Sequence, residues 1–517
     1  MGSKNTSRFN RRNTVALCTA ALTLLLVQGC ACNQTACNSS SDQQPVQQPV
    51  QAASGPITEI PVPTAAPMLA APTGHPMTTQ AALADFDAAW TLVNDTHFDE
   101  NFNGVDWDAM RDKYRPMAEA STTRQQTRRV IGQLLDTLGQ SHFNIIPADL
   151  NDPVGVPHMD TSEQATDSSE AIAAAEKEQA DAALDGQGDA DVGLKVLILD
   201  GHAVVSEVRP DSPADHAGVR MGWIVSHIRS ESIDKRIERL IKAVGEDLVG
   251  IYGVGQVERR LRGPKDSTID LEFLDSNDQP RQLTLSRDDI PGEQIKFGNL
   301  PPMLTNLEWG WIDSKRYNLG DKKIGYIDFT IWMMPIAVKF EEAMVGLKDA
   351  DGIIIDLRGN PGGVGGLAAG LARYFLDEKQ SLGTMQMRGQ KLTFNVSPII
   401  VTRQGERLKP YTNPVAIITD QGSASTSEFF AGGLQALGRV EVFGTRSAGM
   451  ALAAAMDKLP SDDVLIHAIS DYTTSAGNAI EATGVIPEHP VKATRADLLN
   501  GIDAPMQSAA DWIKYKD

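Results

Sequence analysis

Residues 414–430 have the sequence PVAIITDQGSASTSEFF, in which an apolar run is followed by a turn of small polar residues and then by a second apolar stretch. The first run is typical of a buried strand, and the S-x-x-E pattern from Ser425 to Glu428 is typical of a capping box at the start of a helix. We therefore predict a strand, a sharp turn and a helix. A serine at that turn needs no role beyond capping the helix, which is worth about 1 kcal/mol. Its hydroxyl would also lie beside free backbone N–H groups and a helix dipole, which stabilise developing negative charge.

A second strand and turn are predicted at residues 353–366, where IIIDL is followed by RGNPGGVGG. This turn lacks the GK[ST] of a phosphate-binding loop. Gly363, Gly365 and Ala368 imitate a dinucleotide fingerprint. However, they begin well after the strand, and no acid ends a strand about 20 residues later. Glycines at such a turn let a backbone N–H group approach a substrate carbonyl closely, so the pattern favours an oxyanion hole.

Strand-like and helical runs alternate through residues 291–517, which predicts an α/β core with helices layered on buried strands. Two smaller domains precede this core, so the fold class is that of a multidomain α+β chain. Residues 83–150 have the period of a small bundle of about three helices, and residues 192–290 combine short β-like runs with one amphipathic helix at 233–244. Within the core, the expected strands are 323–329, 352–357, 414–419, 440–444 and 464–469, and the expected helices are 367–376 and 428–437.

The N-terminal 29 residues predict export. They carry four basic residues, no acid and a 13-residue apolar run that is too short to span a bilayer, which is typical of a signal peptide. The run ends in Leu26-Val27-Gln28-Gly29-Cys30, which resembles a bacterial lipobox with Cys30 as the lipidated residue; plain secretion is the alternative. Residues 30–82 are rich in Gln, Pro, Ser and Ala and predict a disordered tether. Residues 151–191 are rich in acids and predict a solvated insertion.

Composition excludes several classes of function. The net charge is −20, from 67 acids and 47 bases, which argues against a nucleic-acid binder. All four cysteines precede residue 38, so the rest of the chain can hold no thiolate nucleophile. The nine histidines show no metal-ligand spacing, and we expect neither a metal nor a cofactor.

Three blocks are similar to the signature blocks of the C-terminal processing peptidase and tricorn protease family of serine peptidases. They are residues 356–363 (DLRGNPGG), 422–428 (GSASTSE) and 480–487 (IEATGVIP). The resemblance extends from about residue 83 to residue 491 and implies a crotonase-like layered catalytic core. Residues 201–228, with their S-P-A, A-G and G spacing, resemble a PDZ domain, which binds an extended peptide at a sheet edge. A purely scaffolding role for this small β-domain is the alternative.

By this resemblance Ser425 is the nucleophile. In the processing-peptidase branch the base is a lysine 25 residues later, but Met450 stands at that position and has no group that can accept a proton. In the tricorn-like branch the base is a histidine at the end of the helical domain, preceded by a small polar residue, and this chain has Ser141 and His142 there. A neutral imidazole is suited to accept a serine proton near neutral pH.

The resemblance also implies the remaining parts of the site. Glu481 is the carboxylate that completes the relay through Ser141, an arrangement that would stabilise the imidazolium. The oxyanion donors are the backbone N–H of Thr426 and that of Gly362 or Gly363.

We therefore predict an exported, lipid-anchored serine endopeptidase of the tricorn-like branch, which acts through an acyl-enzyme on polypeptides whose tails the PDZ-like domain holds. It would be a lipoprotein of a bacterial cell envelope, facing the periplasm or bound to the outer membrane. His467 and His489 lie outside the family blocks and are rival bases. Two other functions stay open: a catalytically inactive peptide-binding or scaffold protein, which Met450 motivates, and a crotonase-like enzyme that acts on a small thioester.

Overall fold

The computed structural model describes residues 75–148, 185–186, 188–296 and 303–516, all of which belong to one compact unit of the chain. The predicted signal peptide, the lipidation site Cys30, most of the predicted tether and most of the predicted acidic insertion lie outside these residues. None of the helices in the described ranges is long and apolar enough to cross a membrane.

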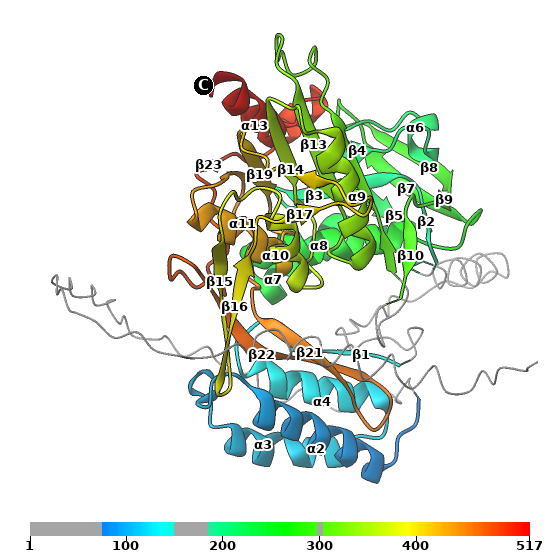
Figure 1. The fold of residues 1–517 in the computed structure, drawn as a ribbon. Coiled ribbons are helices and arrows are strands. Elements are labelled where there is room, and N and C mark those ends of the chain that lie inside the picture. The colour runs from blue at the N-terminus through cyan, green and yellow to red at the C-terminus, as the bar shows by residue number, and fades with distance from the viewer. Residues whose placement is uncertain (1–74, 149–184, 187, 297–302, 517) are drawn as a thin grey trace, which may run out of the picture. The chain divides into compact units, whose positions relative to one another are not determined.

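A six-stranded sheet forms the core of residues 303–516 (Figure 1). Its strand order is β12-β13-β14-β19-β20-β23, and every neighbouring pair is parallel except the antiparallel edge pair of β12 and β13. All residues of β14 and β19 are buried, as expected for parallel strands covered on both faces. The strands are β12 (Leu307–Trp311), β13 (Ile324–Phe329), β14 (Gly352–Asp356), β19 (Val415–Thr419), β20 (Glu441–Gly444) and β23 (His489–Pro490).

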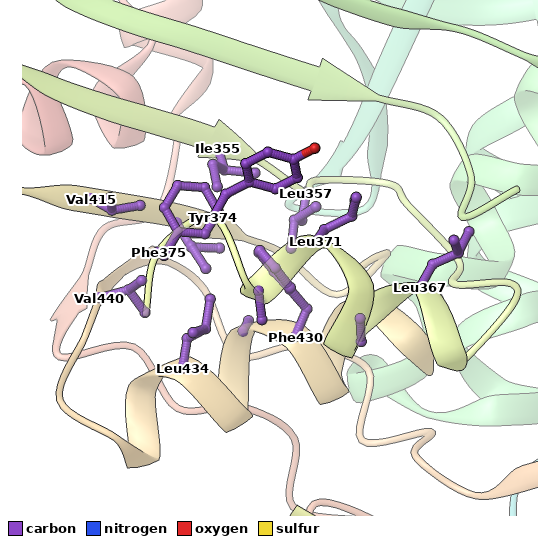
Figure 2. Packing of buried hydrophobic residues seen from close by; sticks show 14 of the residues in the cluster. Ile355, Leu357, Leu367, Leu371, Tyr374, Phe375, Val415, Phe430, Leu434 and Val440 are labelled. Carbon is purple, nitrogen blue, oxygen red and sulfur yellow. The ribbon is translucent and has the colours of Figure 1, made fainter. Parts of the chain in front are cut away.

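Helices cover both faces of this sheet. Ile353 and Ile355 of β14 belong to the apolar cluster that contains α9, α10 and α11, whereas Ile354 packs with α13, because successive strand residues point to opposite faces. Figure 2 shows Ile355 from the sheet in the same cluster as Phe430 of α11. Because β14 and β19 are neighbouring parallel strands, the turns that follow them meet at one edge of the sheet. The helices are α9 (Met334–Gly346), α10 (Gly366–Ala372), α11 (Thr426–Ala436), α12 (Arg495–Leu499) and α13 (Ala504–Tyr515).

A second sheet joins the N-terminal helices to the C-terminal part of the chain. Its order is β1-β22-β15-β16, with β21 also paired to β22. Leu459 and Leu465 pack into the core of the helical bundle, and the buried Arg128 of α4 pairs with Asp463 at 2.6 Å. These contacts hold the end of the bundle beside a hairpin that is 335 positions later in the sequence. The elements are α2 (Thr79–Thr96), α3 (Trp107–Glu119), α4 (Arg124–Asp136), β1 (Asn144–Ile146), β15 (Gln380–Met387), β16 (Gln390–Val396), β21 (Ala453–Lys458) and β22 (Val464–Thr474).

The β-domain is built around the antiparallel sheet β3-β4-β5-β7-β8. The edge strand β3 lies against helix α8, whose Val249 and Val257 are in the same buried cluster as Val196 of β3. The expected helix at 233–244 is α7, but α8 was not predicted. The elements are β2 (Ala190–Asp191), β3 (Leu194–Leu199), β4 (His202–Val208), α6 (Pro213–His216), β5 (Ile224–Ile228), β6 (Glu231–Ser232), α7 (Ile233–Val244), α8 (Glu246–Leu261), β7 (Thr268–Leu274), β8 (Pro280–Ser286) and β9 (Asp288–Asp289).

Several boundaries differ from the expectation, and β22 extends five residues beyond the expected end of its strand at residue 469. Helix α2 begins at Thr79, ahead of the expected start of the bundle at residue 83, because the side chain of Thr78 caps it by accepting from the N–H of Ala81. The side chain of Asp185, expected in a solvated insertion, is only 4% exposed and pairs with Arg287. Helix α10 ends at Ala372, four residues before the expected end of the helix at residue 376.

Candidate active site

Ser425 lies in the turn between β19 and α11. Its φ of 54° and ψ of −116° are unusual for a residue with a side chain, and such strained conformations persist only where the surroundings enforce them. The N–H of Ser425 faces two acceptors, the carbonyl oxygen of Met450 and Oε2 of Glu428, each at 2.9 Å. The predicted strand, turn and helix are therefore present, with Ser425 half-buried at the helix N-terminus.

Glu428 holds this turn in place. Its fully buried carboxylate accepts from Ser447 Oγ at 2.6 Å, from the N–H groups of Gly449 and Met450 at 2.8 and 3.0 Å, and from the N–H of Ser425. Burial raises the pKa of Glu428 to about 7, although the four hydrogen-bond donors favour the ionised form and partly oppose this rise. The sequence pattern indicated only a helix cap here, and it gave no signal that the same carboxylate fixes the turn at 447–450.

The two candidate glycines differ in what their N–H groups do. The N–H of Gly362 donates to Oδ1 of Asn360 at 3.0 Å, and a Cβ atom at Gly362 would lie 2.7 Å from Cβ of Ser425. The hydroxyl of Thr426 donates to the carbonyl of Gly363 at 2.9 Å. Within the described part of the chain, neither the N–H of Gly363 nor that of Thr426 has an acceptor. Two unused donors therefore lie next to Ser425.

A chain of hydrogen bonds joins Glu481, Ser141 and His142. Oε1 of Glu481 accepts from the N–H of Ser141 at 2.9 Å, and Oε2 accepts from the Ser141 hydroxyl at 3.0 Å. The same hydroxyl oxygen lies 2.8 Å from Nδ1 of His142. Because Ser141 has only one hydroxyl proton, the oxygen must accept from Nδ1–H of His142. In this network Nε2 of His142 carries no proton, so its lone pair is free to accept one.

His142 is half-buried and has a left-handed backbone, with a φ of 62°. Burial lowers the pKa of His142 to about 4, since the charged imidazolium loses hydration. The ring is therefore neutral at neutral pH.

One turn anchors both halves of the candidate site. The carbonyl of Met450 accepts from the N–H of Ser425, and the next residue, Ala451, donates its N–H to Oε2 of Glu481 at 2.7 Å. Across the described ranges, the hydroxyl of Ser425 and the ring of His142 form no direct hydrogen bond. Catalytic hydrogen bonds are often long without substrate and tighten when it binds.

The rival histidines have partners elsewhere. His467 is fully buried in β22, between Thr96 Oγ1 at 3.0 Å and Asp457 Oδ2 at 2.9 Å. His489 pairs with Glu441 at 2.9 Å and stacks on the ring of Phe443. Neither histidine is hydrogen-bonded to the residues around Ser425.

Comparisons with known proteins indicate the family. The family model Peptidase family S41 matches residues 323–491, and the model Tricorn protease C1 domain matches residues 80–136. The carboxyl-terminal-processing protease of Synechocystis is 26% identical over 435 residues, which cover 82% of this chain and 85% of that protein. The carboxy-terminal processing protease CtpA of Bacillus subtilis is 24% identical over 308 residues, which cover 59% of this chain and 56% of that protein.

A crystal structure of a CPAF mutant has a TM-score of 0.50 and 11% identity, covers 84% of this chain and 96% of that one, and so shares its fold. The fold match does not identify the family, which is indicated instead by the sequence relatives and the two family models. They match the C-terminal part that holds Ser425 and Glu481 as well as the helices that precede His142. These matches support the C-terminal processing peptidase family and indicate a serine peptidase.

Proposed function

We propose that this chain is an exported endopeptidase in which Ser425 is the nucleophile and His142 the general base. Oγ of Ser425 attacks the carbonyl carbon of a peptide bond while its proton passes to Nε2 of His142. The imidazolium then gives this proton to the leaving amine as the C–N bond breaks, and water hydrolyses the acyl-enzyme by the same route. The observation that carries the proposal is the hydrogen-bonded chain from Glu481 through Ser141 to Nδ1 of His142.

The negative charge of the tetrahedral intermediate needs donors beside Ser425. We assign this role to the N–H groups of Thr426 and Gly363, because both lack an acceptor within the described ranges. The N–H of Gly362 is already used by Asn360. Gly362 instead allows the close approach of its turn to Ser425, where a side chain would not fit.

The test of the proposal is turnover of an unstructured peptide by Ser425→Ala. We expect cleavage to be lost while the circular dichroism spectrum and the unfolding midpoint stay unchanged. Ser286→Ala, at an exposed position of the β-domain, is the matched control and should keep full activity. Undiminished cleavage by Ser425→Ala would remove the nucleophile assignment. His142→Ala with an unchanged rate would remove the base assignment.

The β-domain is proposed to hold the substrate tail in the manner of a PDZ domain. Its strand β3 is at the edge of the sheet, where an extended peptide can add as a further strand. A cavity of about 2590 Å³ is lined by β3 and α8 and also by Arg358, Gly359, Pro361 and residues 419–422, in the turns next to the candidate site. A tail on β3 would therefore lie in the same cavity as the candidate active-site turns.

Glu258 of α8 lies at the open edge of β3. Its Oε1 accepts from the N–H of Val196 at 3.3 Å, and this edge N–H is one that an added strand would use. Peptide binding would thus replace the Glu258 contact with a contact to the peptide.

Export and anchoring are proposed from residues 1–29 and Cys30, with the chain in the bacterial cell envelope. Cys30→Ser should move the protein from the membrane fraction to the soluble fraction, and the wild-type N-terminal peptide should carry the mass of a lipid. A wild-type chain that is soluble and carries no lipid would exclude the anchor.

A further inference from the structure

His97 is a fully buried histidine at the end of α2 that the proposed chemistry does not use. Its Nε2 lies 2.9 Å from Oε1 of Gln140, and its Nδ1 lies 2.8 Å from the carbonyl oxygen of Asp99. The ring also stacks on Phe143, with centroids 5.9 Å apart and planes 14° apart. Nδ1 also accepts from the N–H of Asp99 at 3.2 Å, so a tautomer with its proton on Nε2 donates to Oε1 of Gln140.

The two contacts lie on either side of the candidate base. Gln140 immediately precedes Ser141, and Phe143 immediately follows His142. His97 therefore touches both residues that flank the Ser141–His142 pair, one by a hydrogen bond and the other by ring stacking.

This short segment needs such support. Backbone hydrogen bonds to the last turn of α4 end at Gly139, and residues 140–143 belong to neither α4 nor β1, so no helix or sheet pattern fixes the backbone of residues 140–143. His142 has a φ of 62°, in the left-handed region that side chains other than glycine rarely adopt. Such a conformation persists when neighbouring contacts enforce it. At the start of the segment, Asn103 donates to the carbonyl of Leu138 at 2.9 Å.

We infer that His97 is a positioning residue for the general base, which holds Gln140 and Phe143 and thereby fixes the backbone and burial of His142. The inference rests on the proposed function of His142, since His97 itself touches neither substrate nor nucleophile. Without this clamp, the segment would relax, and the imidazole would become more exposed to water and less well aligned with Ser425.

The test is an NMR titration of the His142 ring in the full-length chain, which does not require turnover. In the wild type, burial holds the pKa of His142 at about 4. In His97→Ala we expect it to rise toward 6.5, the value of an exposed histidine. Glu481, linked to the ring through Ser141, is the charged group that faces it in the hydrogen-bond network, and it is unchanged in these variants. His216→Ala, at an exposed position, is the matched control.

Two further variants separate positioning from folding. His97→Gln keeps an N–H donor for Gln140 and should bring the pKa of His142 part of the way back toward the wild-type value. Gln140→Leu removes the acceptor at a half-buried site, leaves His97 in place and should raise the pKa of His142 in the same direction. Peptide turnover should fall about 10–100-fold in His97→Ala, in kcat with little change in KM, because a misplaced catalytic group slows the chemical step.

The outcomes distinguish the two proposals. An unshifted pKa of His142 in both His97→Ala and Gln140→Leu would overturn the positioning role. A shifted pKa of His142 in both variants, together with a wild-type protein that cleaves no peptide, would support the clamp and reject the proposed base. A kcat loss in His97→Ala that His97→Gln does not relieve, with the pKa unchanged, would assign His97 to the stability of the bundle.

Discussion

Replacement of Glu481 by glutamine tests the relay most directly, because it removes charge while keeping size. The carboxylate accepts three hydrogen bonds, two from Ser141 and one from the N–H of Ala451. An amide has one acceptor oxygen, so its NH₂ group must face at least one of these donors. Where it faces the Ser141 hydroxyl, that hydroxyl turns to donate to Nδ1 of His142, which moves the ring proton to Nε2 and removes the acceptor that the proposed mechanism requires for the Ser425 proton.

The magnitude follows from the distances. Hydrogen bonds of 3.0 and 2.8 Å put the carboxylate oxygen no more than about 6 Å from Nδ1 of His142. At an effective dielectric constant of about 20, a unit charge at that distance stabilises an imidazolium by about 3 kcal/mol. Glu481 is half-buried, and solvent screening reduces this value. We therefore expect kcat to fall roughly 10–100-fold in Glu481→Gln, at about 1.4 kcal/mol for each factor of ten.

The assay is steady-state cleavage of a fluorogenic peptide, with Glu406→Gln as a matched control at an exposed position. Ser141→Ala should cost a similar factor, and the double variant Ser141→Ala/Glu481→Gln should cost little more than either alone, because both residues act through one hydrogen-bond chain. A loss below about threefold in a well-folded Glu481→Gln protein, or additive losses in the double variant, would refute this account of the relay.

Three other predictions concern stability and tail binding. Burial lowers the pKa of His142 from 6.5 to about 4, so between these pH values the unfolded chain binds a proton that the folded chain does not. The free energy of unfolding should therefore be highest above pH 6.5 and decline as the pH drops toward 4. His142→Asn should flatten that decline in urea unfolding measured across this range. Glu428→Ala leaves four donors without their acceptor and should lower the free energy of unfolding by about 3 kcal/mol or more, whereas Glu238→Ala, on an exposed helix face, should stay within about 0.5 kcal/mol in the same urea titration. Glu258→Ala frees the N–H of Val196 and should tighten binding of a peptide with a free C-terminus about 2–10-fold by calorimetry; weaker binding would mean that Glu258 contacts the peptide itself.

Regular elements with a strong pattern could be predicted from the sequence. The apolar runs that became β14 and β19 are buried along their whole length, and such runs have few other stable environments. Helix α8 was missed because Gly250, Gly253 and Gly255 lower its intrinsic helix propensity. Its apolar side chains pack in the core of the β-domain, and this tertiary contact outweighs the propensity.

The hairpin of β15 and β16 was also missed. In β16, Leu392, Phe394 and Val396 alternate with polar residues, as in a half-buried strand, but this run is short and most of β16 is exposed. Pairing with β15, which itself pairs with β22, adds to this short local pattern.

The candidate site divides in the same way. Ser425 and the glycine turn could be found locally, since each follows a recognisable strand. The pairing of Ser141 with Glu481 spans 340 positions, and only the resemblance to a family indicated it. No signal in the sequence showed that Glu428 would bind the turn at 447–450, because the same S-x-x-E pattern serves as an ordinary helix cap.

The buried ion pair of Arg128 with Asp463 has a consequence for heat inactivation. In the proposed mechanism the small bundle supplies the imidazole and the large sheet supplies the hydroxyl, and this pair together with Leu459 and Leu465 attaches one to the other. On warming, detachment of the bundle alone would stop peptide cleavage while the large sheet still gave a native circular dichroism spectrum. Asp463→Asn should therefore widen the gap between the temperature at which cleavage stops and the temperature at which the rest of the chain melts.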